Sequence, residues 1–201
     1  MAKPLPVRGL DPDRRLRPNA RRILAVRIEE VYSYDGLVAD PANVTELHDM
    51  RIACKRLRYL LEIFGVAFGP DLRPFTDEVA GLQDLLGDIH DCDVQIPMLE
   101  GHLAWLSARE AGAAQRLVSA LALGETRRRR GPPSEAAFRA FHRELETGRR
   151  SDERIGVHAL IGRRRREREA LYARFVGEWR RLKLERFRSH LQIALGIGGH
   201  A

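Results

Sequence analysis

Residues 45–64 read TELHDMRIACKRLRYLLEIF, and their apolar and polar side chains separate at helical spacing. At ~100° per residue, the apolar members fall on one arc: Leu47, Met50, Ala53, Cys54, Leu57, Leu60, Leu61 and Phe64. Asn43 precedes the stretch as a predicted N-cap, and Glu46 completes a capping-box pattern three residues later. The stretch therefore predicts an amphipathic helix whose apolar face belongs to a protein core.

The opposite arc of the same helix is cationic. It carries His48, Arg51, Lys55, Arg58 and Tyr59, with Arg56 beside them. Successive helical turns are ~5.4 Å apart, so such a strip can meet successive charges of an extended polyanion. Arginine binds two phosphate oxygens at once, and lysine acts as a point charge. A solvated helix face is the simpler interpretation of these residues, and a polyanion-binding strip is the alternative.

The same periodicity predicts helices in most of the chain. We expect a lead-in over residues 1–17 and a loop over 124–134. Helices are expected over about 18–35, from about 74 to Pro97, and over 99–123, 135–146, 152–184 and 184–195. Pro97 is expected to kink or end its helix, because proline lacks the N–H that an inner turn needs. No stretch alternates with period two, so the sequence predicts an all-α bundle without a sheet.

The charge of the chain is positive and unevenly spread. The 201 residues carry a formal net charge of +7, and 32 of the 35 basic residues are arginine. Residues 1–100 hold 13 basic and 17 acidic side chains, whereas residues 101–201 hold 22 basic and 11 acidic ones. A basic half indicates an anionic partner, and this leaves nucleic acid, a membrane surface and a phosphate polymer open.

The compartment is predicted from cysteines and apolar runs. Two cysteines, Cys54 and Cys92, are too few for a disulfide framework, so a reducing environment is expected. The first residues lack the apolar run of a signal peptide, and no run approaches the ~20 apolar residues that span a bilayer. We therefore expect a cytoplasmic protein without a membrane partner.

Three arginines lie in phase with apolar residues of their predicted helices: Arg27, Arg164 and Arg168. Arginine is seldom fully buried without a partner. An internal ion pair and an internal polar channel explain these positions equally well. Asp93 is in phase with the apolar residues of its own helix, so we expect it to pair with an inward arginine.

Two other functional classes, a metal-dependent phosphohydrolase and a nucleic-acid-binding protein, fit part of the sequence. The dipeptides His48-Asp49 and His90-Asp91 are similar to those of helical HD phosphohydrolases, which hydrolyse phosphate esters at a metal. Such dipeptides also arise by chance, and Cys92 has no cysteine neighbour for a metal site. The arginine runs 127–130 and 163–166 suit nucleic-acid backbones, but aromatics are only 6% of the chain and show no stacking pattern.

Two segments resemble a known family. LHDMRIACKRLRYLLEIF, residues 47–64, matches the pattern H-x-x-R-x-x-x-[KR]-R-x-R of the conserved-histidine α-helical domain, abbreviated CHAD. LQDLLGDIHDCDV, residues 82–94, matches the leucine–glycine–acid run of the same family. The segments VRGLDPDRRLRPNARRILAVRIEEV and LIGRRRREREALYARFVGEW are similar to it more loosely.

The resemblance implies an antiparallel helical domain over residues 18–195. Its two pseudo-symmetric halves, about 18–123 and 135–195, are expected around a basic groove or pore. It further implies non-catalytic binding of inorganic polyphosphate, without cofactor or metal, and association with polyphosphate granules. The residues assigned to binding are Arg27, His48, Arg51, Lys55, Arg56, Arg58, Tyr59, Arg164, Arg165 and Arg168. Nucleic acid is expected to bind only non-specifically, and both a monomer and a homodimer fit.

Overall fold

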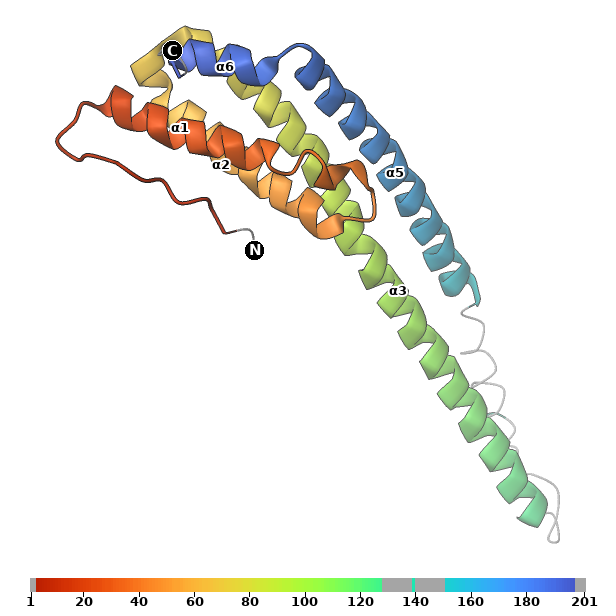
Figure 1. Ribbon diagram of the computed structural model, residues 1–201. Helices are drawn as coiled ribbons and strands as arrows, with labels where there is room; N and C mark the ends of the chain where they lie inside the picture. The colour runs from red at the N-terminus through yellow and green to blue at the C-terminus, as the bar shows by residue number, and fades with distance from the viewer. Residues whose placement is uncertain (1–2, 128–138, 140–150, 198–201) are drawn as a thin grey trace. The chain divides into compact units, whose positions relative to one another are not determined.

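The computed structural model describes residues 3–127, 139 and 151–197, and in this part of the chain every regular element is helical (Figure 1). The prediction of an all-α protein is thus confirmed for the described residues. The elements are α1 (Leu16–Tyr32), η1 (Leu37–Ala39), α2 (Val44–Phe68), η2 (Pro70–Leu72), α3 (Arg73–Arg127), α5 (Ser151–Leu184) and α6 (Phe187–Leu195). No described helix is both long enough and apolar enough to cross a membrane.

The chain divides into two compact units. The first unit consists of Met1–Asp93 and Glu167–Ala201, and the second unit is Val94–Arg166. The division falls inside α3 and inside α5, so each of these helices contributes one part to each unit. The predicted halves, 18–123 and 135–195, concern internal symmetry, which this division does not test, and they stay a prediction.

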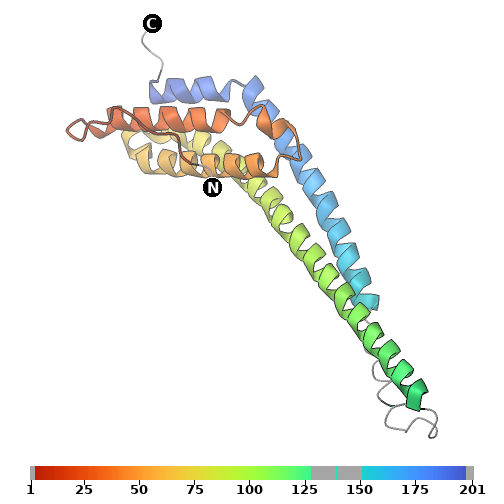
Figure 2. The same ribbon diagram turned by 60° about the horizontal axis from the view of Figure 1, so that its bottom comes forward.

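The first unit is a helical bundle with one apolar core. In it, α1, α2 and α6 run side by side (Figures 1 and 2). The predicted apolar face of α2 faces this core, since Leu47, Met50 and Leu57 are each at most 2% exposed. Phe175 and Trp179 of α5 join the same core. The core holds α2 so that its opposite, cationic arc faces outward.

The start of α2 agrees with the sequence, but the contacts there differ. Asn43 is the N-cap residue, as predicted, and α2 begins at Val44. The Asn43 side chain makes no capping bond, because its Nδ2 donates to the carbonyl of Leu37, 2.8 Å away. The predicted capping interaction is therefore replaced by a bond that ties the η1 turn to the start of the helix.

Pro97 does not end α3, so of the two effects predicted there, a kink or an end, the end is wrong. The helix continues through Pro97 as one element of 55 residues. Proline removes one hydrogen bond from the ladder. That loss is offset because buried apolar positions continue on both sides, with Ile89 before and Leu106 after the proline. The predicted helix over 99–123 is the continuation of α3.

The predicted loop over 124–134 is only partly described. Residues 124–127 belong to α3, which corrects that part of the prediction. The remainder of the loop, and the predicted helix over 135–146 apart from residue 139, lie outside the described residues.

Candidate anion-binding site

The cationic strip of α2 comprises His48, Arg51, Lys55, Arg58 and Tyr59, and it lies on the face opposite the core. Lys55 and Tyr59 are exposed, whereas His48 and Arg51 are half-buried. The burial of these two shows that a second helix covers part of the strip. The predicted solvated face is therefore incomplete at its N-terminal end.

The covering helix is the first part of α3. Gln83, Gly87 and His90 recur along it at spacings of four and three residues, which places them on one stripe. Arg58 donates to Gln83 Oε1 at 3.5 Å, and the His48 and His90 ring centroids are 4.7 Å apart with a 31° tilt. A Cβ added to Gly87 would lie 3.6 Å from Arg51 Nε, an ordinary contact distance, so the Arg51 guanidinium lies directly beside α3 at this position.

Three nitrogen atoms in this contact are buried without a hydrogen-bond partner in the described structure: His48 Nδ1, Arg51 Nε and His90 Nδ1. The nearest oxygen recorded for His90 Nδ1 is Asp91 Oδ1, which at 3.6 Å is too distant for a hydrogen bond. An unmet buried polar group costs about 1–3 kcal/mol, more when charged. An anion that accepted these bonds would remove that cost.

The protonation of His48 responds to the same surroundings. Burial lowers its pKa below the usual 6.5, and the neighbouring His90 and Arg51 lower it further, while Asp49 opposes them. His48 is consequently held toward its neutral form in the free protein. An anion placed at His48 would favour the protonated form and raise this pKa.

The exposed end of the strip is organised around Tyr59. The Lys55 ammonium lies 5.7 Å from the centre of the Tyr59 ring, and the Arg58 guanidinium lies 5.2 Å from it. Arg58 Nε also donates to Glu62 Oε1 at 3.0 Å. These contacts keep two cations beside one phenol hydroxyl at the surface of the helix.

Two predicted binding residues instead contact a buried carboxylate. Arg27 of α1 and Arg56 of α2 both bind Glu30, whose side chain is 3% exposed. The Arg56–Glu30 distance is 2.5 Å, and Arg27 also donates to the carbonyl of Leu5 at 2.5 Å. This group, the Glu30 cluster, answers the question that the sequence left open for Arg27, which occupies an internal ion pair.

Arg168 likewise has an internal partner. Its guanidinium binds the Asp93 carboxylate and donates to the carbonyl of Pro41 at 2.8 Å. The expectation that Asp93 pairs with an inward arginine is confirmed. Arg164 and Arg165 belong to the second unit, where Arg165 binds Glu100 at 2.6 Å.

The described residues contain no group of three or more His, Cys, Asp or Glu side chains placed to hold a metal ion. The structure does bring the two His-Asp dipeptides together through the His48–His90 contact. Cys54 is fully buried, and burial raises the pKa of its thiol to about 12. It is therefore a core residue and not a reactive thiolate.

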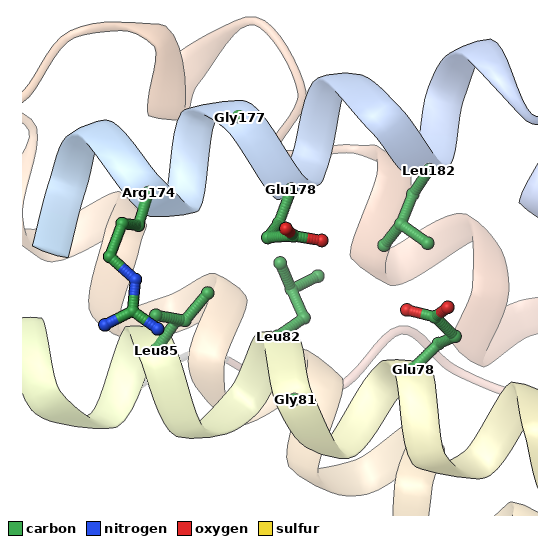
Figure 3. A pocket seen from close by; sticks show the side chains of 8 residues that line it. All are labelled: Glu78, Gly81, Leu82, Leu85, Arg174, Gly177, Glu178 and Leu182. Atoms are coloured by element: carbon green, nitrogen blue, oxygen red, sulfur yellow. The ribbon is translucent and has the colours of Figure 1, made fainter.

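A pocket of about 440 Å³ lies between α3 and α5 in the first unit (Figure 3). Its floor is apolar, with Leu82, Leu85 and Leu182, and its rim includes Glu78 and Glu178. Both carboxylates bind Arg181. The pocket residues of α3 lie on the stripe opposite Gln83, Gly87 and His90. The pocket therefore lies on a different face of α3 from the contact with α2 and does not extend the cationic strip.

A family model described as the CHAD domain matches residues 3–100. Residues 3–100, just under half of the chain, are therefore a CHAD-type segment. The resemblance inferred from the sequence is thus confirmed, and the matched CHAD segment contains the whole cationic strip together with Gln83, Gly87 and His90. Searches of curated proteins and of solved structures found no match to the chain.

Three residues of α3 that lie against the cationic strip were not identified from the sequence. His90 was noted only as half of a His-Asp dipeptide, and Gln83 and Gly87 were not singled out. Their four-and-three spacing is visible in the sequence. What the sequence lacks is a sign that this polar stripe of α3 packs against the cationic arc of α2.

Proposed function

We propose that the CHAD segment binds inorganic polyphosphate, without catalysis, along the cationic strip of α2. The observation that carries the proposal is the set of buried nitrogens without partners on His48, Arg51 and His90. Arg51 Nε is a donor, and an imidazole donates from both nitrogens once it is protonated, so this group is suited to phosphate oxygens. The match to a family linked to polyphosphate and triphosphate binding supports the same ligand class.

The binding mechanism is multiple charge pairing along a fixed surface. His48, Arg51, Lys55 and Arg58 are spaced by three or four residues, so each turn of α2 offers one cation. Phosphate groups of an extended chain would bind these cations in succession, with Tyr59 donating at the exposed end. Release of condensed counterions would supply much of the affinity, by analogy with nucleic acids. Longer chains should bind more tightly, because they engage more cations.

Three of the other predicted residues have a supporting role in this proposal. Arg27 and Arg56 neutralise Glu30, and Arg168 neutralises Asp93. These arginines keep α1, α2, α3 and α5 in place around the strip. Recruitment to polyphosphate granules in the cytoplasm would follow directly from such binding and requires no further site.

The test is a titration with long-chain polyphosphate at ~150 mM salt, competed by single-stranded DNA, RNA and orthophosphate. We expect polyphosphate binding that nucleic acid and orthophosphate displace poorly. Equal displacement by DNA or RNA would make the strip a general basic surface and contradict the proposal. Phosphate release in the presence of Mg²⁺ or Mn²⁺ would contradict its non-catalytic character.

A double variant locates the site. Arg51→Ala with Arg58→Ala should weaken polyphosphate binding at least tenfold while the helical content stays unchanged. The matched control is Arg174→Ala with Arg180→Ala, which removes two exposed arginines of α5 and the same net charge. Equal loss of affinity in both double variants would show that net charge, and not the strip, determines binding.

A further inference from the structure

In the second unit, α3 carries an inner apolar stripe that α5 covers. The stripe consists of Ile96, Leu99, Leu103 and Leu106, which are half-buried or buried. Ile161 of α5 is 5% exposed, and the ion pairs Arg154–Glu110 and Arg165–Glu100 join the two helices at 2.7 and 2.6 Å. This side of α3 is therefore occupied.

A second stripe on the same part of α3 is uncovered. It consists of Val94, Met98, Gly101, Trp105, Ala108 and Gly112, and we call it the outer seam. Its spacing of four and three residues in alternation is the spacing of a helix–helix seam. The large members are exposed, with Val94 at 53%, Met98 at 65% and Trp105 at 52%.

A helix with two seams belongs in a bundle of more than two helices, and the described part of the second unit supplies only α3 and α5. Two neighbouring side chains also restrict the orientation of the exposed Trp105 ring. His102 stacks on its ring at 5.6 Å, and the Arg109 guanidinium lies 5.3 Å from the ring centre. An exposed aromatic side chain with few remaining rotamers is typical of an interface anchor.

The order of large and small residues identifies the occupant. When the outer seam is paired antiparallel with itself, Val94 faces Gly112, Met98 faces Ala108, and Trp105 faces Gly101 of the second copy. Every large side chain thus meets a small one, as interdigitating helices require. We propose that the outer seam is a homodimer interface, formed by two copies of α3 in antiparallel orientation about a two-fold axis.

Small side chains beside the outer seam are consistent with this occupant. The exposed Ala104 and Ala111 flank the seam and allow the two backbones a close approach.

Sedimentation equilibrium of the full chain over 1–200 µM tests the proposal. Because a seam of about five turns is short, we expect a dimer with micromolar dissociation, and a mass that rises from 22.9 kDa toward twice that value. Gly101→Trp should abolish association, because two tryptophans would then face each other. A Cβ on Gly101 meets nothing within 4 Å, so the substitution fits a single chain.

The decisive variant exchanges the large side chain of Trp105 with the small residue at Gly101. Trp105→Ala alone should weaken association at least tenfold, and Gly101→Trp with Trp105→Ala should restore it to within about threefold of the wild type. Ala114→Trp, at an exposed position of α3 outside the outer seam, is the control that leaves association unchanged. Circular dichroism confirms the helix in each variant, and Ala108→Trp replaces Gly101→Trp should the latter unfold.

Three outcomes would overturn the proposal. The first is a wild-type chain that stays monomeric at every concentration. In the second, Gly101→Trp, or Ala108→Trp in its place, associates as tightly as the wild type. The third is an exchanged double variant that does not recover, since its recovery depends on the antiparallel pairing. A monomer in which Trp105 is shielded from a fluorescence quencher would assign the seam to a segment of the same chain instead.

Discussion

The two sides of α2 hold positive charge in opposite ways. On the side facing α1, Arg56 shares the buried carboxylate of Glu30 with Arg27. On the side facing α3, His48 and Arg51 meet His90, and each of these residues keeps one buried nitrogen without a partner in the described structure. The same helix therefore carries a neutralised cation on one side and unmet donors on the other.

This difference separates cations that hold the fold from cations available to a ligand. A buried charge is tolerated where a carboxylate compensates it, and the cost of removing that carboxylate is high. Unmet donors lower stability, and proteins retain such groups mainly where function needs them. Charge alone did not distinguish the two groups in the sequence, since both consist of arginines on predicted helices.

The largest expected effect concerns the Glu30 cluster. Glu30→Ala should lower the free energy of unfolding by about 3–5 kcal/mol, because it leaves two arginines, one of them buried, without their shared partner. Chemical denaturation measures this change. Glu29→Ala is the matched control, since Glu29 is half exposed and pairs with Arg188 at the surface, where a loss below about 1 kcal/mol is expected. Equal losses in both variants would remove the contrast between the two sides of α2.

The next effect concerns Arg51, whose replacement should weaken ligand binding without lowering stability. Arg51→Met should weaken polyphosphate binding about tenfold, the value of one charge-assisted hydrogen bond. The same variant should leave the free energy of unfolding unchanged or raise it by up to about 1 kcal/mol, because it removes an unmet buried donor. Calorimetric titration and denaturation check the two parts. A large loss of stability would show that Arg51 belongs with the structural arginines.

The effect of pH follows from His48. Its pKa is lowered in the free protein, and a bound polyanion would raise it, so binding should take up a proton. Affinity should be greatest below the free-protein pKa and fall as pH rises through the pKa of the complex, about tenfold for each unit by which the two pKa values differ. His48→Gln should flatten this profile between pH 5 and 8. A profile that keeps its slope in this variant would assign the proton to another group.

The smallest effect is the change in salt dependence. The slope of log affinity against log salt should become less steep by roughly two in Arg51→Ala with Arg58→Ala, by analogy with one ion released per phosphate contact on nucleic acids. Titrations between 50 and 300 mM salt measure the slope. An unchanged slope alongside weaker binding would indicate that the two arginines act through position and not through direct pairing.

Much of the fold followed from local patterns. The periodicity placed the start of α2 and gave an end of α5 at Leu184 that the structure repeats. A helix end at Pro97, one of the two effects predicted there, was wrong, because a proline rule describes the local cost but not the apolar contacts on either side that outweigh it. The end of α2 was predicted at Phe64 and lies at Phe68, where Gly69, with φ of 93°, ends the helix.

The candidate site divides in the same way. The cationic arc of α2 can be predicted from residue spacing alone, because side-chain direction in a helix depends only on the local turn. The partners of these side chains do not follow from local order, since Glu30 and Asp93 reach their arginines, and His90 reaches His48, only when separate helices pack. Local sequence accounts for which residues share a face, and packing between distant segments accounts for which charges are neutralised and which donors stay available. That division exists because helical periodicity is a short-range property, whereas the burial and pairing of a charged group depend on the whole core around it.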